Sequence, residues 1–343
     1  MALLEGVDER PGRSSWLRCV HFDPLSCRTL VLAGRLLSTT TMACKEGETM
    51  GTVWLLALLT LSGASTPMVA GTSAGPAASH VAALFIPKPD PAHLPHGIRL
   101  SEMDGDSISY SANWAGYAQS AVKGTFTSVT DTWDVPTVTT ERGSQYSSDW
   151  VGIDGFTDRQ LVQAGTNADN VNGVAEYSAW TEILPAPSVP LPMTIAPGDS
   201  ITTVVKEIAA NTWLMQVTDN TSQVTQRRTV SYVAPGKDVE AIHEQTTICN
   251  PRCALRGLAT TTDVTFDPGS YTSTIQPTSQ PLLRPAISRQ RTTKRGTRVT
   301  YARVNDIIMV NANTAIATPS ATNTADDGFT VADGSTAPAS PDG

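Results

Sequence analysis

From residue 109 onward the chain alternates short runs of strand-forming residues with turn signals, and this alternation limits the folds it can adopt. Threonine and valine are abundant in the runs, and their branched side chains suit a pleated sheet. No segment sustains the apolar spacing of a helix over any length. Regular short strands separated by turns are typical of a sandwich or a barrel. The sequence therefore predicts an all-β fold, with strands at 124–135, 149–153, 160–163, 174–183, 200–208, 212–219 and 223–233.

Glycine, proline, asparagine and aspartate mark the expected turns between these strands. They occur at Asp154-Gly155, Asn172-Gly173, Pro197-Gly198-Asp199, Asp219-Asn220 and Pro235-Gly236. Glycine and asparagine tolerate the left-handed backbone that tight turns require, and proline fixes one of their dihedral angles.

The two-residue period of a strand predicts which side chains share a face. Trp180 and Glu182 would share a face, and Glu240, Ile242 and Glu244 would share another. An acidic residue beside a tryptophan is unexpected in a plain core. It is natural on a concave face that binds a ligand, so these strands are candidates for a binding site.

The composition supports a real core and disfavours one class of partner. Of the 343 residues 40% are hydrophobic, and only 16% are charged. The formal net charge is −8, and an acidic chain repels phosphate backbones, so we expect no nucleic-acid partner. A low density of charged groups also suits a protein that works in acid.

An apolar run at residues 53–61 is too short to span a bilayer as a helix. Lys45 precedes it and small residues follow it, which is the pattern of a secretory signal peptide. We therefore expect a signal peptide at 50–70, a secreted, extracellular product without a stable membrane anchor, and an upstream extension at 1–49 that arises from a misplaced start. A genuine long leader or an anchor is the alternative.

The segment 71–108 is rich in alanine, glycine, proline and serine, which is typical of a linker or propeptide. We expect it to be removed, or to be sensitive to proteases, before full activity. The residues at 334–343 are small and polar and are expected to form a disordered tail. The folded domain is then 109–333, and we expect it to be a monomer.

The usual hydrolytic chemistries find little support in this domain. His243 is its only histidine, so a serine triad has one possible base, and no cluster offers zinc geometry. Cys249 and Cys253 are its only cysteines, and in an exported protein we expect them to form a disulfide rather than a thiolate site. The elbow-like motif Gly71–Gly75 lies in the linker, with no strand before it. We expect neither a metal nor another cofactor.

An unusual series of motifs remains. In chain order it comprises Ser111-Ala112-Asn113-Trp114-Ala115-Gly116-Tyr117, Trp133-Asp134-Val135-Pro136, Ser148-Asp149-Trp150-Val151-Gly152-Ile153-Asp154-Gly155, Leu161-Val162-Gln163-Ala164-Gly165, Tyr177-Ser178-Ala179-Trp180-Thr181-Glu182, Val239-Glu240-Ala241-Ile242-His243-Glu244, Asp263-Val264-Thr265-Phe266 and Ala317-Thr318-Pro319-Ser320. From about 111 to 331 the order and spacing resemble the glutamic peptidases, the eqolisins.

The resemblance implies an antiparallel β-sandwich of two bent sheets, a concanavalin-like or lectin-like jelly roll. It also implies a secreted endopeptidase that works in acid on protein or peptide substrates without a cofactor. The family's catalytic glutamine falls on Gln163 and its catalytic glutamate on Glu240. Its supporting acidic and aromatic positions fall on Trp114, Trp150, Asp154, Tyr177, Trp180 and Glu182.

The chemistry of this pair is sensible in its own right. Peptide hydrolysis needs a base for water, a stabiliser for the oxyanion and an acid for the leaving amine. A carboxylate such as Glu240 can take the proton of water and return it to the amine. The amide of Gln163 can donate to the developing oxyanion, while its carbonyl helps to hold the water.

Some positions depart from the family's pattern. Ala241 stands where tryptophan is usual, Ile183 replaces an aromatic residue, and residues 258–262 lie near a usual Asp-Phe pair. We expect these losses to thin the aromatic surroundings of Glu240. The alternative function is therefore a catalytically eroded, lectin-like module that binds polysaccharide or peptide.

Residues 284–303 contain seven basic residues and no aspartate or glutamate. Either a solvated hairpin or a contact site for an acidic surface explains this segment.

Overall fold

The computed structural model describes residues 45–46, 49–50, 101–103, 106–249 and 253–342. The chain divides into two units, residues 1–80 and 81–343. In the first unit, the described residues form one antiparallel pair, β1 (Lys45–Glu46) and β2 (Thr49–Met50). The remaining strands belong to the second unit. The predicted leader and signal peptide, and most of the predicted propeptide, lie outside the described residues.

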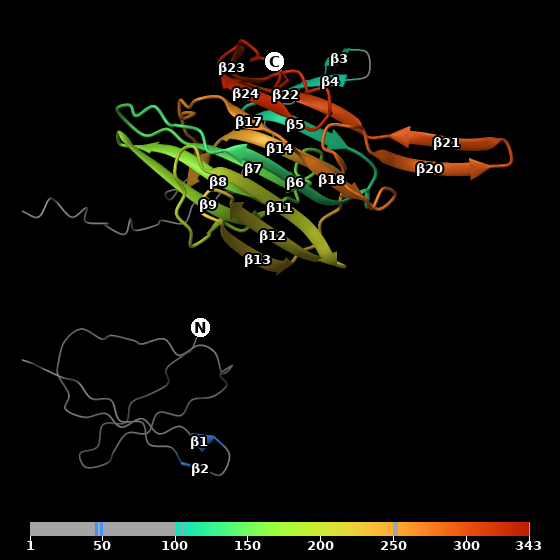
Figure 1. Cartoon of the computed structure of the whole chain (residues 1–343), viewed down its shortest axis with the longest axis horizontal. Helices are drawn as coiled ribbons and strands as arrows, with labels where there is room; N and C mark the ends of the chain where they lie inside the picture. The colour runs from blue at the N-terminus through green and yellow to red at the C-terminus, as the bar shows by residue number, and fades with distance from the viewer. Residues whose placement is uncertain (1–44, 47–48, 51–100, 104–105, 250–252, 343) are drawn as a thin grey trace, which may run out of the picture. The chain divides into compact units, whose positions relative to one another are not determined.

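One large sheet of the second unit carries the candidate site (Figure 1). In spatial order its strands are β3 (Ser101–Met103), β4 (Asp106–Ser111), β22 (Arg303–Asn311), β5 (Trp114–Ser120), β14 (Asp238–Gln245), β7 (Ser147–Ile153), β8 (Val162–Val171), β9 (Val174–Ile183) and β10 (Val189–Pro190). All of these neighbours pair antiparallel except β4 and β22, which run parallel.

A second sheet packs against the first. Its strands are β13 (Val224–Ser231), β12 (Thr212–Asp219), β11 (Ser200–Ala209), β6 (Phe126–Asp134), β17 (Val264–Phe266), β18 (Ser270–Ser273), β19 (Gln280–Pro281), β24 (Phe329–Asp333) and β23 (Thr314–Pro319). β23 also pairs with β22, which joins the two sheets at one edge. The predicted all-β, antiparallel sandwich is confirmed.

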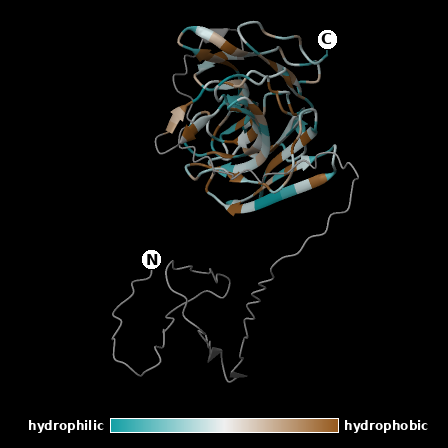
Figure 2. Ribbon diagram, turned by 90° about the vertical axis from the view of Figure 1, so that its left-hand side faces the viewer, coloured by the Kyte–Doolittle hydropathy of each residue, from teal (hydrophilic) through white to brown (hydrophobic). Residues whose placement is uncertain are grey.

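Alternation along the strands separates the main core from the site. On β7 the side chains of Val151 and Ile153 belong to the main core, whereas Trp150 belongs to a second apolar cluster. On β14, Val239 and Ala241 likewise join the main core. Apolar and polar residues follow one another along the strands (Figure 2). One face of the first sheet therefore packs on the second sheet, and its other face carries the site.

Contacts between aromatic side chains fill the main core. The indole Nε1 of Trp133 on β6 donates a hydrogen bond of 3.1 Å to the Thr166 hydroxyl on β8. The rings of Phe266 and Phe329 stack with centroids 5.0 Å apart. A sheet anchored in this way is a rigid base for side chains on its other face.

The predicted turn at Asn172-Gly173 joins β8 to β9. Both residues have positive φ, 53° and 86°, as a two-residue hairpin of this kind requires. Because the turn fixes the register, Val171 lies opposite Val174 and the pairing continues to Val162 opposite Ile183.

A short hairpin carries the two domain cysteines. Cys249 on β15 (Thr247–Cys249) lies opposite Cys253 on β16 (Cys253–Leu255), and Cys253 is disulfide-bonded. The side chain of Cys249 lies outside the described residues, so the predicted partner stays a prediction. Within the part of the chain that the structure describes, no helix is long and apolar enough to cross a membrane.

A buried histidine lies on the opposite side of β14 from Glu240. His243 Nδ1 is 2.7 Å from Asp149 Oδ1, and its Nε2 is 3.9 Å from Asp333 Oδ1. Burial lowers the pKa of His243, but the nearby charge of Asp149, its hydrogen bond and the charge of Asp333 raise it, and the net direction is upward. The stability that this group contributes is therefore present below about pH 6.5 and is lost as the pH rises through its folded pKa.

Buried carboxyls act in the same direction. Burial raises the pKa of Asp131, Asp238, Glu240 and Asp333, and raises that of Asp154 from 3.8 to about 7. In the window between the unfolded and folded pKa, the folded chain keeps a proton that the unfolded chain loses. Unfolding is then increasingly favoured as the pH rises.

We predict that the free energy of unfolding falls as the pH rises from 3.8 to about 7. Asp154 alone should contribute a slope of about 1.4 kcal/mol per pH unit in this window. Asp154→Asn should make the pH dependence shallower by this amount, whatever its effect on absolute stability. Urea unfolding at a series of pH values measures the slope.

Asp134→Asn is the control for this experiment, because Asp134 is exposed on β6. It should leave the slope unchanged. An unfolding free energy that rises from acid to neutral pH would contradict the interpretation of the buried carboxyls.

Candidate active site

One row of residues across four strands defines the candidate site. Glu240 on β14 lies opposite Gly152 on β7, Gly152 lies opposite Gln163 on β8, and Gln163 lies opposite Glu182 on β9. Directly opposed residues of antiparallel strands point to the same face of the sheet. The register therefore brings the predicted pair onto one face, with Glu182 beside it. The two sets predicted to share separate faces lie on the same face.

Glu182 orients the amide of Gln163. The Gln163 Nε2 donates a hydrogen bond of 2.7 Å to Glu182 Oε2, and both side chains are buried. The Gln163 Oε1 is buried and has no hydrogen-bond partner among the described residues. An amide nitrogen carries two hydrogens, so one remains available to a substrate. The contact assigns Nε2 to the Glu182 side and leaves a carbonyl acceptor and one N–H for chemistry.

Gly152 keeps the space between Glu240 and Gln163 free of a side chain. A Cβ at this position would lie 2.8 Å from Leu161 Cδ1, 3.0 Å from Trp150 Cζ3 and 3.3 Å from Gln163 Cβ. Its backbone does not have positive φ, so the requirement for glycine is one of space rather than backbone conformation.

Glu240 is fully buried, and neither carboxyl oxygen has a hydrogen bond of normal geometry. Burial raises its pKa well above the usual value, and the charges of Asp238, Asp154 and Asp158 raise it further, while the backbone of Phe156 lowers it. In the closed site Glu240 therefore favours its protonated form. Admission of water would remove the largest of these causes.

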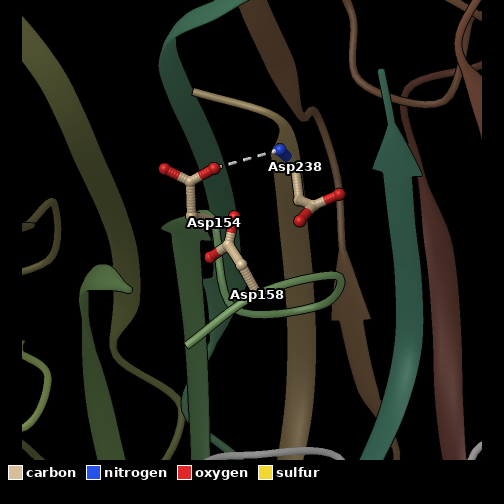
Figure 3. A group of neighbouring side chains, drawn as sticks. All are labelled: Asp154, Asp158 and Asp238. Carbon is tan, nitrogen blue, oxygen red and sulfur yellow. Dashed lines mark hydrogen bonds between the residues drawn. The ribbon is translucent and has the colours of Figure 1, made fainter. Parts of the chain in front are cut away.

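Three aspartates border the row at the end of β7 and the start of β14 (Figure 3). One carboxyl oxygen each from Asp154, Asp158 and Asp238 lies within 4.8 Å of the others. The backbone N–H groups of Gly236 and Lys237 donate to Asp154 at 2.7 and 2.6 Å, and the Lys237 ammonium is 3.2 Å from Asp158. Asp154 itself has φ of 67° and turns the chain out of β7.

These contacts favour shared protons over a bound cation. The amide and hydroxyl of Thr157 donate to Asp238 Oδ2 at 2.9 and 2.6 Å, so donors already face all three carboxyls. A cation would compete with these donors and with the Lys237 ammonium. Burial raises the pKa of both Asp154 and Asp238, as expected for carboxyls that hold protons close to one another.

Tryptophans border the row on its other side. Trp150, two residues before Gly152, lies opposite Gly165, and Gly165 lies opposite Trp180. Trp114 meets Trp150 edge to face with ring centroids 5.0 Å apart. All three indoles are nearly fully buried and share an apolar cluster with Ile242, Leu161, Phe156 and Leu184. They adjoin the site as predicted, but as packed side chains rather than open walls.

Glu244 supports this aromatic cluster, a role that the sequence did not reveal. Its Oε2 accepts a hydrogen bond of 2.8 Å from Trp150 Nε1, and its Oε1 accepts one of 3.2 Å from Asn113 Nδ2. Both contacts span the sheet between segments far apart in the chain. Strand parity could place Glu244 on this face but could not identify its donors.

Other predicted residues lie elsewhere. Tyr177 is on the opposite face of β9, where its hydroxyl accepts a hydrogen bond of 3.0 Å from the Val138 N–H, so it does not join the site. Ala241 and Ile183 also pack on the main core. The expectation that their substitution thins the surroundings of Glu240 is therefore wrong, because both side chains point away from it.

Comparisons with known proteins place the chain in a family. The model of the Peptidase A4 family matches residues 112–308, more than half of the chain. The chain therefore belongs to the Peptidase A4 family. It is a peptidase of the glutamic class, an endopeptidase that hydrolyses peptide bonds in proteins or peptides. No curated protein sequence matches the chain.

Solved structures support the fold. Scytalido-glutamic peptidase with a peptide-based transition-state analogue has a TM-score of 0.51 and 22% identity, covering 65% of this chain and 98% of that chain. SCP-B of the eqolisin family, in complex with a tripeptide, has a TM-score of 0.49 and 21% identity over the same shares. Aspergilloglutamic peptidase from Aspergillus niger has 0.39 and 22%, covering 55% of this chain and 98% of that chain. The first of these likenesses supports the sandwich architecture.

We predict that Gly152→Ala lowers kcat/KM on the order of 100-fold, because the added methyl group displaces the side chains on either side of it. Overpacking of this kind should also cost about 1–3 kcal/mol of stability. Steady-state kinetics and thermal unfolding of the same preparations separate the two effects.

Gly257→Ala is the matched control, because Gly257 lies outside the site and its added Cβ would meet Gln145 Cγ at 3.3 Å. It should retain activity. Full activity of Gly152→Ala would show that the gap between Glu240 and Gln163 is not needed.

Proposed function

We propose that the chain is a secreted, acid-acting endopeptidase in which Glu240 is the general base and Gln163 stabilises the oxyanion. The observation that carries this proposal is the row Glu240, Gly152, Gln163 and Glu182, in which a glycine separates a carboxyl from an oriented amide. The apolar run at 53–61 supports export.

The reaction needs one group for the water and one for the carbonyl. Ionised Glu240 takes a proton from the attacking water, and the remaining N–H of Gln163 donates to the oxygen that becomes negative. The carbonyl of Gln163 helps to hold the water. Glu240 then returns the proton to the leaving amine as the C–N bond breaks, so no metal or cofactor is required.

Glu182 is a positioning residue in this scheme. Its carboxyl accepts one N–H of Gln163 at 2.7 Å and thereby fixes which side of the amide faces the substrate. A primary amide without such an acceptor can turn over and present its carbonyl to the oxyanion. A fixed donor is effective because it requires no reorganisation as charge develops.

The burial of Glu240 and Gln163 implies that the site opens to bind its substrate. Both side chains are 0% exposed in the closed arrangement. Entry of water reduces the desolvation that raises the pKa of Glu240, and this favours the ionised form that the base needs. Opening and activation of the base are thus linked.

The eroded binding module receives less support. Its argument rested on Ala241, and that side chain packs in the main core on the other face of β14. The pair and the Glu182 acceptor remain together on the site face.

We predict that Glu240→Gln, which keeps the size of the side chain but removes the base, lowers kcat on the order of 100-fold or more. Gln163→Ala should lose activity on a similar scale, because it removes the oxyanion donor. The double variant should be little worse than Glu240→Gln alone, since both groups act on one transition state. Cleavage of an unfolded protein in acid measures all three.

Glu176→Gln is the matched control, because Glu176 lies on the same face of β9 as Glu182 but is exposed. It should keep full activity. If Glu240→Gln cleaves as fast as the unaltered protein, Glu240 is not the base and the proposed mechanism is wrong.

A second prediction concerns pH. Asp238 is the neighbouring charge that contributes most to the raised pKa of Glu240. Asp238→Asn keeps an oxygen for Thr157 but removes the charge, so the pKa of Glu240 should fall. The acid limb of the pH–rate profile, where activity appears as the base ionises, should then move to lower pH by up to about one unit.

Asp134→Asn, remote and exposed on β6, should leave this limb in place. Movement of the limb to higher pH in Asp238→Asn would mean that the charge of Asp238 does not act on the base.

A further inference from the structure

A basic hairpin stands apart from both large sheets. β20 (Ile287–Thr293) and β21 (Gly296–Tyr301) pair only with each other among the described strands, and they extend away from the other strands of the unit (Figure 1). Nearly every residue from Arg289 to Tyr301 is exposed. The hairpin does not contribute to the main core or to the row that contains Glu240, so its composition needs a separate explanation.

The positive charge of the hairpin has no internal counterpart. Its free cations are Arg289, Arg291, Lys294, Arg295 and Arg298. No carboxylate lies within ion-pairing distance of any of them in the described part of the chain. The whole chain carries a net charge of −8, so the cluster is not a consequence of a generally basic protein.

The register gathers three of the arginines on one face. Arg291 lies directly opposite Arg298, and Arg289, two residues before Arg291, points to the same side. Like charges directly opposite one another destabilise a pair of strands, and an isolated two-stranded hairpin has little stability to spare. On the other face, Thr292 and Thr297 form a hydrogen bond of 3.1 Å that supports the pairing. An anion on the arginine face would remove the repulsion.

We propose that this arginine face docks a polysaccharide that carries sulfate or phosphate esters. Guanidinium groups stay charged at any pH a protein meets and match the oxygens of sulfate and phosphate. Such esters also remain anionic in acid, whereas the carboxylates of an acidic protein lose charge there. The Arg289, Arg291 and Arg298 fork offers repeated contacts along a linear chain, and the partner holds the peptidase near its substrate.

Two other polyanions fit less well. Single-stranded nucleic acid is held by bases that stack on aromatic side chains, and the arginine face offers none. Tyr301, which is 60% exposed, alternates to the opposite face from Arg298. A membrane-inserting hairpin would carry apolar anchors at its tip, but Lys294, Arg295 and Gly296 occupy that position.

The test compares dextran sulfate with neutral dextran as probes for the full chain in acid and at neutral pH. Dextran sulfate should bind at both pH values and weaken as salt rises, and neutral dextran should not bind. The triple variant R289Q/R291Q/R298Q should bind dextran sulfate on the order of 100-fold more weakly. Its thermal stability should not fall, because the Arg291–Arg298 repulsion is removed. R289K/R291K/R298K should keep most of the binding.

The matched control is R142Q/R227Q/R256Q, which removes the same charge from exposed arginines on other segments. It should bind like the unaltered chain, and both triple variants should cleave a short uncharged peptide at the normal rate. The proposal is overturned if R289Q/R291Q/R298Q binds dextran sulfate as tightly as the control. It is equally overturned if single-stranded DNA or anionic phospholipid vesicles bind the hairpin more tightly than dextran sulfate.

Discussion

The antiparallel register of β14, β7 and β8 is the constraint on which the site depends. It places Glu240 and Gln163 on either side of Gly152, so two side chains 77 residues apart in the chain face one gap. A slip of one residue in either pairing would send one of them into the main core. Tight turns and the packing of the opposite face against the second sheet fix the register. The stability of the sandwich and the geometry of the site therefore have the same origin.

Desolvation links this geometry to acid. The strands of the site are buried on both faces, so carboxyls on them lose their hydration and favour the protonated form. Glu240 and Asp238 do so on the site face of β14, while His243 on the other face prefers its charged form beside Asp149. These preferences differ in chemistry but share a direction, since each retains a proton in the folded chain. The fold is thus suited to acid before any question of catalysis.

The sequence predicted strands best where apolar and polar residues alternate. The expected strands at 174–183 and 212–219 coincide with β9 and β12. The run expected at 160–163 instead begins at Val162 and continues to Val171, because its second half looks like a loop. Asn167, Asp169 and Asn170 are polar, yet all are buried and bonded, for example through the 3.0 Å contact of Asn167 with the Ser178 hydroxyl. Pattern alone cannot identify a strand whose polar side chains find partners elsewhere in the chain.

The site was predictable in part, for a similar reason. Strand parity and motif spacing indicated Gln163, Glu240 and Glu182, whereas the proximity of Asp158 and Asp238 depends on the turn at Asp154, whose contacts arise only after folding. Parity also bears on the loss of an aromatic residue at Ala241. Because neighbouring residues of a strand point to opposite faces, a change at that position acts on packing between the sheets. It can alter the stability of β14 without changing any group that faces Glu240, so an altered motif here is no sign of a lost activity.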